Sequence, residues 1–200
     1  MPITLLSKSE FTTKKWSGGT TSELFIYPKT SNYKALNFDF RISTATVEIE
    51  TSTFTKLPNV DRTLLVLDGE MELLFTEYPE KNRVLKPYNT ACFSGGWNTV
   101  SKGKCVDFNL MTRNGVQGEV KGMKLLPLDT VKFKTTKEKN RLYRFVFFIS
   151  GKGEILEAEN NKQKLNPGDF IVIEDPANTP FSIIAKEESE LAIVDVYKNN

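Results

Sequence analysis

The hydrophobic residues of this chain fall into short runs that are separated by Gly, Pro, Asn and Asp. Within several runs apolar and polar residues alternate, and helical spacing is nearly absent. Alternation with a period of two, bounded by turn residues, is typical of all-β sandwiches and barrels. The pattern predicts strands at residues 24–27, 38–50, 63–67, 71–75, 90–93, 104–112, 130–134, 143–149, 153–158, 170–173, 181–185 and 191–197. Only residues 7–10, with the sequence SKSE, predict a capped helical turn.

The second half of the chain weakly repeats the first. Three pairs of segments match at offsets of 82, 80 and 88 residues: 65–69 with 147–151, 85–87 with 165–167, and 106–108 with 194–196. A nearly constant offset predicts two copies of one β module. We place the first copy at residues 1–115 and the second, degenerate copy at residues 116–200. The N-terminal strand could pack on the second copy.

A turn in the second copy points to a specific fold. Pro167-Gly168-Asp169 precedes an apolar strand, which resembles the second sequence motif of the cupin fold. In that motif a metal-ligating His normally follows the strand, but here residues 178–181 read NTPF. The turn is therefore present and the metal ligand is absent. Together with the repeat, this predicts an all-β double cupin (bicupin), with two β-barrel or jelly-roll modules and little helix.

Composition restricts the chemistry. The 200 residues are 39% hydrophobic and 26% charged, as in ordinary soluble globular proteins. The chain has no His, so Ser-His-Asp triads, Cys-His pairs and His-ligated metal sites are excluded, and we expect neither a metal nor a cofactor. A net charge of +2 gives no reason to expect nucleic-acid binding. The basic residues 132–141 are interpreted as a solvated strand or loop edge.

The apolar segments, the N-terminal residues and the cysteines indicate where the protein is expected to reside. No apolar run approaches the roughly 18 residues of a membrane span, and the N-terminus lacks a secretory apolar segment. Cys92 and Cys105 form no metal motif and lie in apolar, strand-like contexts. We therefore expect a cytoplasmic protein, away from membranes, whose two thiols stay reduced and buried as small hydrophobic residues.

Polar residues in two predicted strands share a face with apolar ones. Arg41 and Ser43 do so in one strand, and Asp107 and Asn109 do so in the other, because side chains alternate along a strand. One interpretation is a polar face in water, which is common in antiparallel sheets. The other places these four residues inside the mouth of a barrel, where an Arg beside an Asp offsets the cost of burying either charge.

Two further segments could complete such a site. Arg62 opens the following strand, and two converging arginines form a fork suited to a carboxylate or a phosphate. The Gly-Gly loop at residues 15–23 offers Trp16 as an apolar wall and Thr21 and Glu23 as hydrogen-bonding groups. This loop equally fits a surface turn that a tryptophan anchors.

Several segments in order along the chain resemble the HutD/Ves family of double-cupin proteins: residues 16–24, 38–45, 54–62, 67–69, 93–95 and 107–111. The resemblance implies a cytoplasmic, metal-free cupin that is linked to histidine utilisation. It also implies that the first module binds a small acidic metabolite, N-formylglutamate, in a regulatory role. Two features depart from the family pattern: the Trp-Gly-Gly loop is shorter, and Gly96-Trp97 stand where an acidic residue is usual.

Three functions remain in view. The first is the binding of a small carboxylate, with no catalytic residue, by the set Arg41, Arg62, Trp16, Thr21, Glu23, Ser43, Asp107 and Asn109. The second is a metal-independent enzyme (isomerase, epimerase or lyase) with Glu23 or Asp107 as base and Lys15 or Tyr88 as acid. The third is a structural or partner-binding protein. Residues 143–149 are apolar on both faces, so packing between the modules or a homodimer interface would have to cover them.

Overall fold

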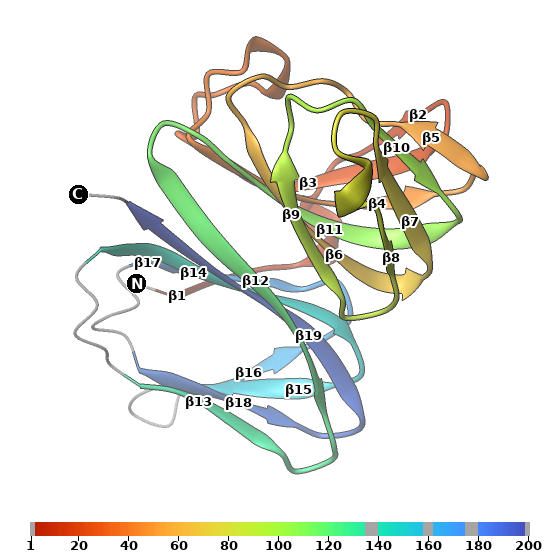
Figure 1. Cartoon of the computed structure of the whole chain (residues 1–200). Helices are drawn as coiled ribbons and strands as arrows, with labels where there is room; N and C mark the ends of the chain where they lie inside the picture. The colour runs from red at the N-terminus through yellow and green to blue at the C-terminus, as the bar shows by residue number, and fades with distance from the viewer. Residues whose placement is uncertain (1–2, 135–139, 158–161, 175–179, 199–200) are drawn as a thin grey trace. The chain divides into compact units, whose positions relative to one another are not determined.

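A computed structural model describes residues 3–134, 140–157, 162–174 and 180–198, and these ranges consist almost entirely of β-strands (Figure 1). The only helical elements among them are short 3-10 turns: η1 (Lys8–Glu10), η2 (Tyr33–Ala35) and η3 (Pro79–Lys81). The predicted all-β class is confirmed. No helix in the described ranges is long and apolar enough to cross a membrane.

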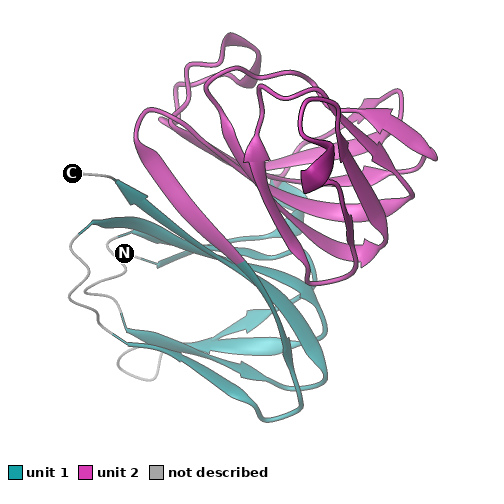
Figure 2. Cartoon of the chain, in the orientation of Figure 1, with its two compact units in different colours: residues 1–10, 121–200 teal, residues 11–120 magenta. Residues whose placement is uncertain are grey.

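The chain divides into two compact units, residues 11–120 and residues 1–10 with 121–200 (Figure 2). Their bounds differ from the predicted modules, 1–115 and 116–200. The first ten residues belong to the second unit because β1 (Ile3–Leu6) pairs with a strand of that unit, β17 (Phe170–Glu174).

The first unit contains two antiparallel sheets. The six-stranded sheet has the order β2 (Thr13–Trp16), β3 (Gly19–Tyr27), β4 (Phe40–Val47), β11 (Cys105–Thr112), β6 (Asp61–Gly69) and β9 (Thr90–Ser94). The four-stranded sheet has the order β5 (Thr51–Thr53), β10 (Thr99–Lys102), β7 (Met71–Phe75) and β8 (Arg83–Leu85). A buried core joins Leu64 and Val66 of one sheet to Met71 and Leu73 of the other. We call the face of the six-stranded sheet that carries Leu64 the inner face.

The second unit has the same plan. Its larger sheet has the order β1, β17, β14 (Arg141–Ser150), β19 (Ser189–Lys198) and β12 (Val116–Leu125), and β12 begins within residues 11–120. Its smaller sheet has the order β13 (Thr130–Phe133), β18 (Phe181–Ala185), β15 (Gly153–Leu156) and β16 (Lys162–Leu165). Val146 and Phe148 of β14 pack in its core with Ile155 and Ile183. The predicted double cupin is therefore confirmed.

The register of the strands corrects one part of the predicted repeat. Arg62 of β6 pairs across the sheet with Met111 of β11, and Arg144 of β14 pairs with Asp195 of β19. Since β6 and β14 hold the same place in their sheets, Met111 is the counterpart of Asp195. The match of Asp107 with Asp195 is wrong because the two carboxylates lie at different positions along equivalent strands.

The predicted turns form as expected. In the Pro-Gly-Asp turn Gly168 has a φ of 90°, and the Asp169 carboxylate accepts a hydrogen bond from the Asn166 backbone N–H. Only a residue that tolerates positive φ fits there, which explains the glycine. At the N-terminus, the Glu10 carboxylate accepts from the Ser7 backbone N–H and caps η1. Residues 178 and 179, where a cupin metal ligand would be expected, lie outside the described ranges.

The apolar strand β14 is covered on both faces within the single chain. Phe145 and Phe147 lie on one face and Val146 and Phe148 on the other, and all four are buried. The apolarity of this strand therefore does not require a second copy of the chain.

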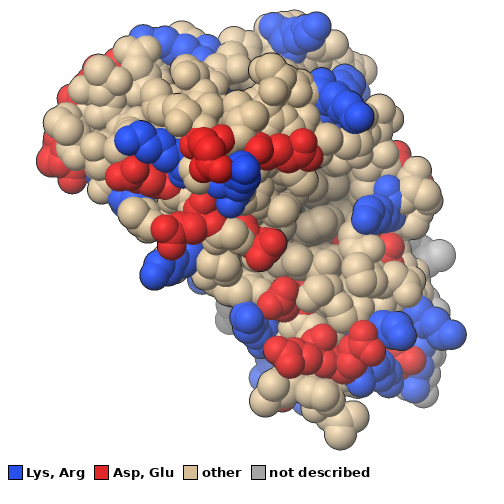
Figure 3. Space-filling model, turned by 90° about the vertical axis from the view of Figure 1, so that its right-hand side faces the viewer, with Lys and Arg blue, Asp and Glu red and all other residues tan. Residues whose placement is uncertain are grey.

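Charged side chains are mixed on the surface. Figure 3 shows one face of the molecule, on which acidic and basic side chains are interspersed. In the basic stretch 132–141, Lys132 and Lys134 are exposed, as predicted for a solvated edge. Arg141 is buried, so that interpretation is wrong at its last residue. Residues 135–139 lie outside the described ranges.

The two cysteines lie in different environments. Cys105 is buried on the inner face of β11, and burial, followed by the negative charges of Asp107 and Asp68, raises the pKa of its thiol to about 12. Cys92 is exposed, because it lies across from Thr63 on the outer face of the edge strand β9. The prediction that both cysteines are buried is wrong for Cys92.

We expect one cysteine of the native protein to react with a thiol reagent at pH 8. Cys92 should react because it is exposed, and Cys105 should react only in denaturant, since a buried thiol of high pKa provides almost no thiolate. A disulfide-exchange reagent with mass spectrometry measures both. Rapid modification of native Cys92→Ser protein would contradict this placement of Cys105.

Candidate functional site

The polar residues predicted from the sequence lie together on the inner face of the first unit. The register of the strands sets these residues in successive rungs, each rung being a row of residues that pair across neighbouring strands. The first rung holds Arg41, Met111 and Arg62, the second holds Glu23, Ser43 and Asn109, and the third holds Thr21, Ala45 and Asp107. Arg41 and Arg62 are separated by one strand, about 10 Å between Cα atoms at usual strand spacing. One sheet face therefore presents two guanidinium groups at one end and an amide and a carboxyl group further along.

These side chains point into the barrel. Arg41, Ser43, Asp107 and Asn109 are all buried, so the interpretation of a polar face in water is wrong for them. On the opposite face of the same strands, Phe40, Ile42, Phe108 and Leu110 are buried too, so the polar residues do not form a water-facing side. The interpretation with the polar residues inside the barrel is therefore the correct one.

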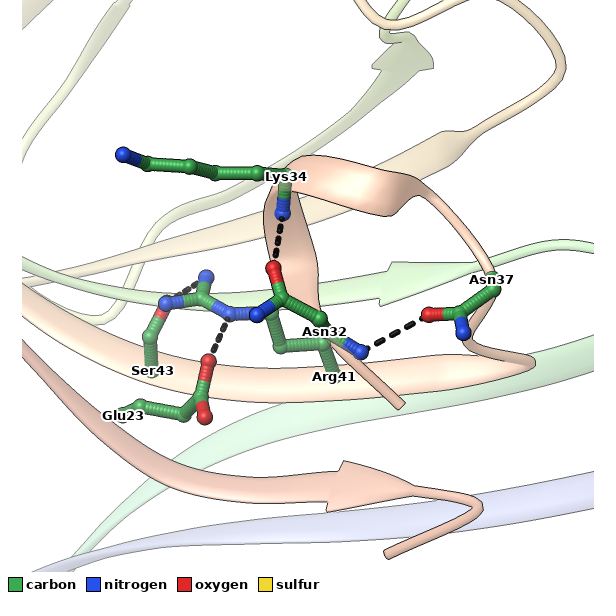
Figure 4. Close-up of polar contacts among 6 residues, drawn as sticks. All are labelled: Glu23, Asn32, Lys34, Asn37, Arg41 and Ser43. Carbon is green, nitrogen blue, oxygen red and sulfur yellow. Dashed lines mark hydrogen bonds and ion pairs between the residues drawn. The ribbon is translucent and has the colours of Figure 1, made fainter. Parts of the chain in front are cut away.

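Arg41 has a carboxylate partner near solvent. Its Nε donates to Glu23 Oε2 at 2.7 Å, and its Nη1 donates to Ser43 Oγ at 2.9 Å (Figure 4). The Arg41 side chain is 8% exposed, while the Glu23 side chain is 41% exposed. The ion pair thus connects the buried face to water at Glu23.

A loop between β3 and β4 covers Arg41 with an aromatic ring. The Tyr33 ring centroid lies 4.5 Å from the Arg41 guanidinium carbon. Asn37 accepts a hydrogen bond from the Asn32 backbone N–H, and Asn32 accepts one from the Lys34 N–H (Figure 4). These bonds shape the turn that presents Tyr33, which sequence reasoning missed. The Asn residues on either side of it are the signal that could have suggested such a turn.

Arg62 has only part of the hydrogen bonding that a buried guanidinium needs. Its Nη2 donates to the Thr55 carbonyl at 2.9 Å, and its guanidinium carbon lies 5.1 Å from the Phe54 ring centroid. Its Nε is buried and has no hydrogen-bond partner among the described residues. A Cβ at Gly95 would lie 3.3 Å from this Nε, so the glycine lets the backbone approach the arginine closely.

The deeper end of the face holds polar groups in a mostly apolar setting. Burial raises the pKa of the Asp107 carboxyl to about 7, against the opposing effect of the Arg62 charge. Burial also lowers the pKa of Arg62; Tyr33 and Asp107 act to raise it, and the like charge of Arg41 lowers it further. Asn109 Oδ1 is buried without a hydrogen-bond partner among the described residues.

Some residues that we named from the sequence lie away from the arginines. Trp16 is 38% exposed and packs with Ile49 over Gly18 at the turn of its hairpin, because the short loop ends several rungs from Arg41. Thr21 shares the inner face on the rung of Asp107. Of the proposed acids, Lys15 is exposed on the outer face, whereas the Tyr88 N–H donates to the carbonyl of Val66, which lies across from Asp107.

The arrangement suits the binding of an anion. Two guanidinium groups are balanced by Glu23, which lies near solvent, and by Asp107, whose pKa of about 7 makes it only partly charged at neutral pH. A buried donor with no partner carries a desolvation cost that an oxygen ligand would remove. No group of three His, Cys, Asp or Glu side chains in the described ranges could hold a metal ion.

Comparison with known proteins places this fold. Residues 8–192 match the model of the HutD family. A conserved protein of unknown function from Pseudomonas aeruginosa PAO1 is 16% identical with a TM-score of 0.79, over 98% of this chain and 99% of that one. HutD from Pseudomonas fluorescens SBW25, solved in a formate condition, is 18% identical with a TM-score of 0.72, over 99% and 100% of the two chains.

The fold also occurs in a metal-bound protein. The bacterial pirin YhhW in complex with nickel(II), from Escherichia coli, is 14% identical with a TM-score of 0.69, over 98% of this chain and 100% of that one. A search of curated proteins gave no significant match.

We expect the stability of the Asp107→Asn variant to differ from wild type in a pH-dependent way. The folded pKa of Asp107 lies above its unfolded value, so the wild type loses stability as pH rises from about 4 to about 7, while the neutral amide does not titrate. The free energy of unfolding of the wild type should fall by up to about 4 kcal/mol relative to the variant. Urea unfolding between pH 4 and 8 measures this. A constant difference would show that Asp107 titrates normally.

Proposed function

The chain belongs to the HutD family, and we propose that its first barrel binds a small carboxylate metabolite, of the N-formylglutamate kind, between Arg41 and Arg62. We propose further that this binding serves a regulatory role related to histidine utilisation. The observation that carries the binding proposal is the buried Nε of Arg62, which has no partner among the described residues.

The charge at the site favours a carboxylate. Arg62 already uses Nη2 on the Thr55 carbonyl, and its Nε remains for an added oxygen. A carboxylate oxygen there would make a charge-assisted hydrogen bond, which is stronger than a neutral one. With Glu23 paired to Arg41 and Asp107 only partly ionised, the two guanidinium groups leave a net positive charge on the buried face, which favours an anionic ligand.

The deeper residues favour a ligand with a hydrogen-bond donor as well. Asn109 Oδ1 accepts nothing from the described residues, and Asp107 lies one rung further along the same face. An amide N–H or a hydroxyl group a few ångströms from the ligand's carboxylate would satisfy one of these acceptors. An N-acyl amino acid carries both groups, whereas a simple fatty acid carries only the first.

Thermal unfolding should reveal this binding. N-formylglutamate should raise the Tm, and at about 100 times Kd it should add about 2.7 kcal/mol of stability. Arg62→Met should abolish the shift, because the methionine keeps the volume and removes the donors. The matched control is Arg83→Met, since Arg83 is exposed on β8 and its Nε donates to the Lys81 carbonyl. An equal shift in both variants would reject the assignment of Arg62.

A second candidate function is a metal-independent enzyme, because Asp107 meets one requirement of a general base. Its pKa of about 7 matches neutral pH, where such a base works best. Asp107 shares its face with the arginines that would hold the substrate carboxylate. Of the acids suggested from the sequence, Lys15 is exposed on the outer face, while the Tyr88 backbone bonds to Val66, across from Asp107.

Turnover measurements separate binding from catalysis. If the protein is an enzyme, N-acyl amino acids incubated with it should change in NMR spectra, and Asp107→Asn should lower the rate at least about a hundredfold while the thermal shift persists. Asp68→Asn is the matched control, because Asp68 lies at the exposed end of β6. Absence of turnover in the wild-type protein would leave binding as the function.

A further inference from the structure

The second barrel contains an arginine in the place that Arg62 occupies in the first. Arg144 of β14 lies across from Ile173 of β17, as Arg62 of β6 lies across from Phe93 of β9. Both arginines point to the inner face of their sheet, since Arg144 alternates with the core residue Val146. The two modules therefore bury a guanidinium at the same position.

The surroundings of the two arginines are similar, and they differ at one key position. The Arg144 guanidinium carbon lies 5.0 Å from the Phe133 ring centroid, at the end of β13, and that of Arg62 lies 5.1 Å from the Phe54 ring centroid, just after β5. Across from Arg62 the strand β11 carries Met111. Across from Arg144 the equivalent strand β19 carries Asp195.

Asp195 binds Arg144 as a carboxylate ligand would. Arg144 Nε donates to Oδ1 and Nη2 donates to Oδ2, each at 2.7 Å, which is the paired geometry of an arginine and a carboxylate. The two side chains are only 11% and 15% exposed. A second guanidinium lies close, with Arg141 Nε 3.4 Å from Oδ1. Arg62 lacks this partner, and its Nε is the atom left without an acceptor among the described residues.

We propose that the second barrel holds a carboxylate site of the same design as the first, occupied by the chain's own Asp195. Further along this face the second site is apolar, because Ile193 and Leu191 stand at the positions of Asn109 and Asp107. Once freed of Asp195, the site would accept a short monocarboxylate and would not select for a hydrogen-bond donor. This inference rests on the register and contacts of the second unit, not on the ligand of the first.

Chemical rescue tests the proposal. Asp195→Ala removes the carboxylate and leaves space of the size of formate, so its Tm should fall below that of the wild type. Formate should then raise its Tm saturably, by about 2–4 °C once formate exceeds its Kd severalfold, beyond any shift in the wild type. Formamide and sodium chloride at equal concentration control for volume and ionic strength. Arg144→Met/Asp195→Ala should lose most of the rescue, since the paired donors of Arg144 are gone and only the more distant Arg141 Nε remains.

Each outcome either supports or overturns the proposed carboxylate site of the second barrel. A formate shift in Asp195→Ala that equals the wild-type shift, or that formamide reproduces, overturns the proposal whether or not the first barrel binds a ligand. If Asp195→Ala does not fold unaided, the refolding yield takes the place of Tm. A higher yield in formate than in formamide supports the site, and equal yields overturn it. A failed Arg62 experiment alongside a positive rescue would reject only the function proposed for the first barrel.

Discussion

A guanidinium buried inside an apolar barrel needs an oxygen partner, and this need governs both modules of the protein. Removing a charge from water costs several kcal/mol unless close, hydrogen-bonded partners replace the solvent. In the second module Asp195 gives Arg144 two charge-assisted bonds. In the first module Met111 stands at that position. Arg62 donates one hydrogen bond to a backbone carbonyl, and its guanidinium packs against one aromatic ring. The chain thus contains two versions of the same arginine site. In one the guanidinium has a carboxylate partner, and in the other its Nε has no hydrogen-bond partner among the described residues.

At the proposed site, the binding of an anion near Arg62 would be coupled to the protonation of Asp107. Burial and the Arg62 charge act in opposite directions on Asp107, and burial is the larger effect, so its pKa is raised to about 7. A bound carboxylate would add a negative charge near Asp107 and favour its neutral form. Ligand and proton therefore promote each other's binding, as linkage requires. Binding at the proposed site would therefore depend on pH in the neutral range, although the chain has no histidine.

Much of this arrangement could be predicted from the sequence. Alternation in β4 and β11 placed Arg41, Ser43, Asp107 and Asn109 on one face, and the apolar residues that continue this face favoured the barrel interior over water. The repeat and the Pro-Gly-Asp turn predicted the double cupin. Strand alternation and turn chemistry are local features, and local periodicity determines which face a side chain occupies.

Other features depend on pairing between distant strands and could not be predicted. The short strands β5 and β16 are polar, as edges of sheets commonly are, and show little alternation. A bulge at Leu67 of β6 shifts the pairing with β11 between Val106 and Asp107, and β14 has one at the equivalent Ile149, so the register across both strand pairs differs from a simple count of residues. Tyr33 reaches Arg41 through the fold of a loop, which no strand pattern encodes.

The most direct test of the account is an NMR titration of the arginine Nε–H resonances of the native protein with N-formylglutamate, assigned through Arg62→Met and Arg144→Met variants. The account predicts that the Arg62 Nε–H signal moves saturably downfield, toward the position expected for a carboxylate-bound arginine, while the Arg144 signal stays unchanged because Asp195 already holds that group. An Arg62 signal that remains fixed at saturating ligand, or an Arg144 signal that moves instead, would contradict it.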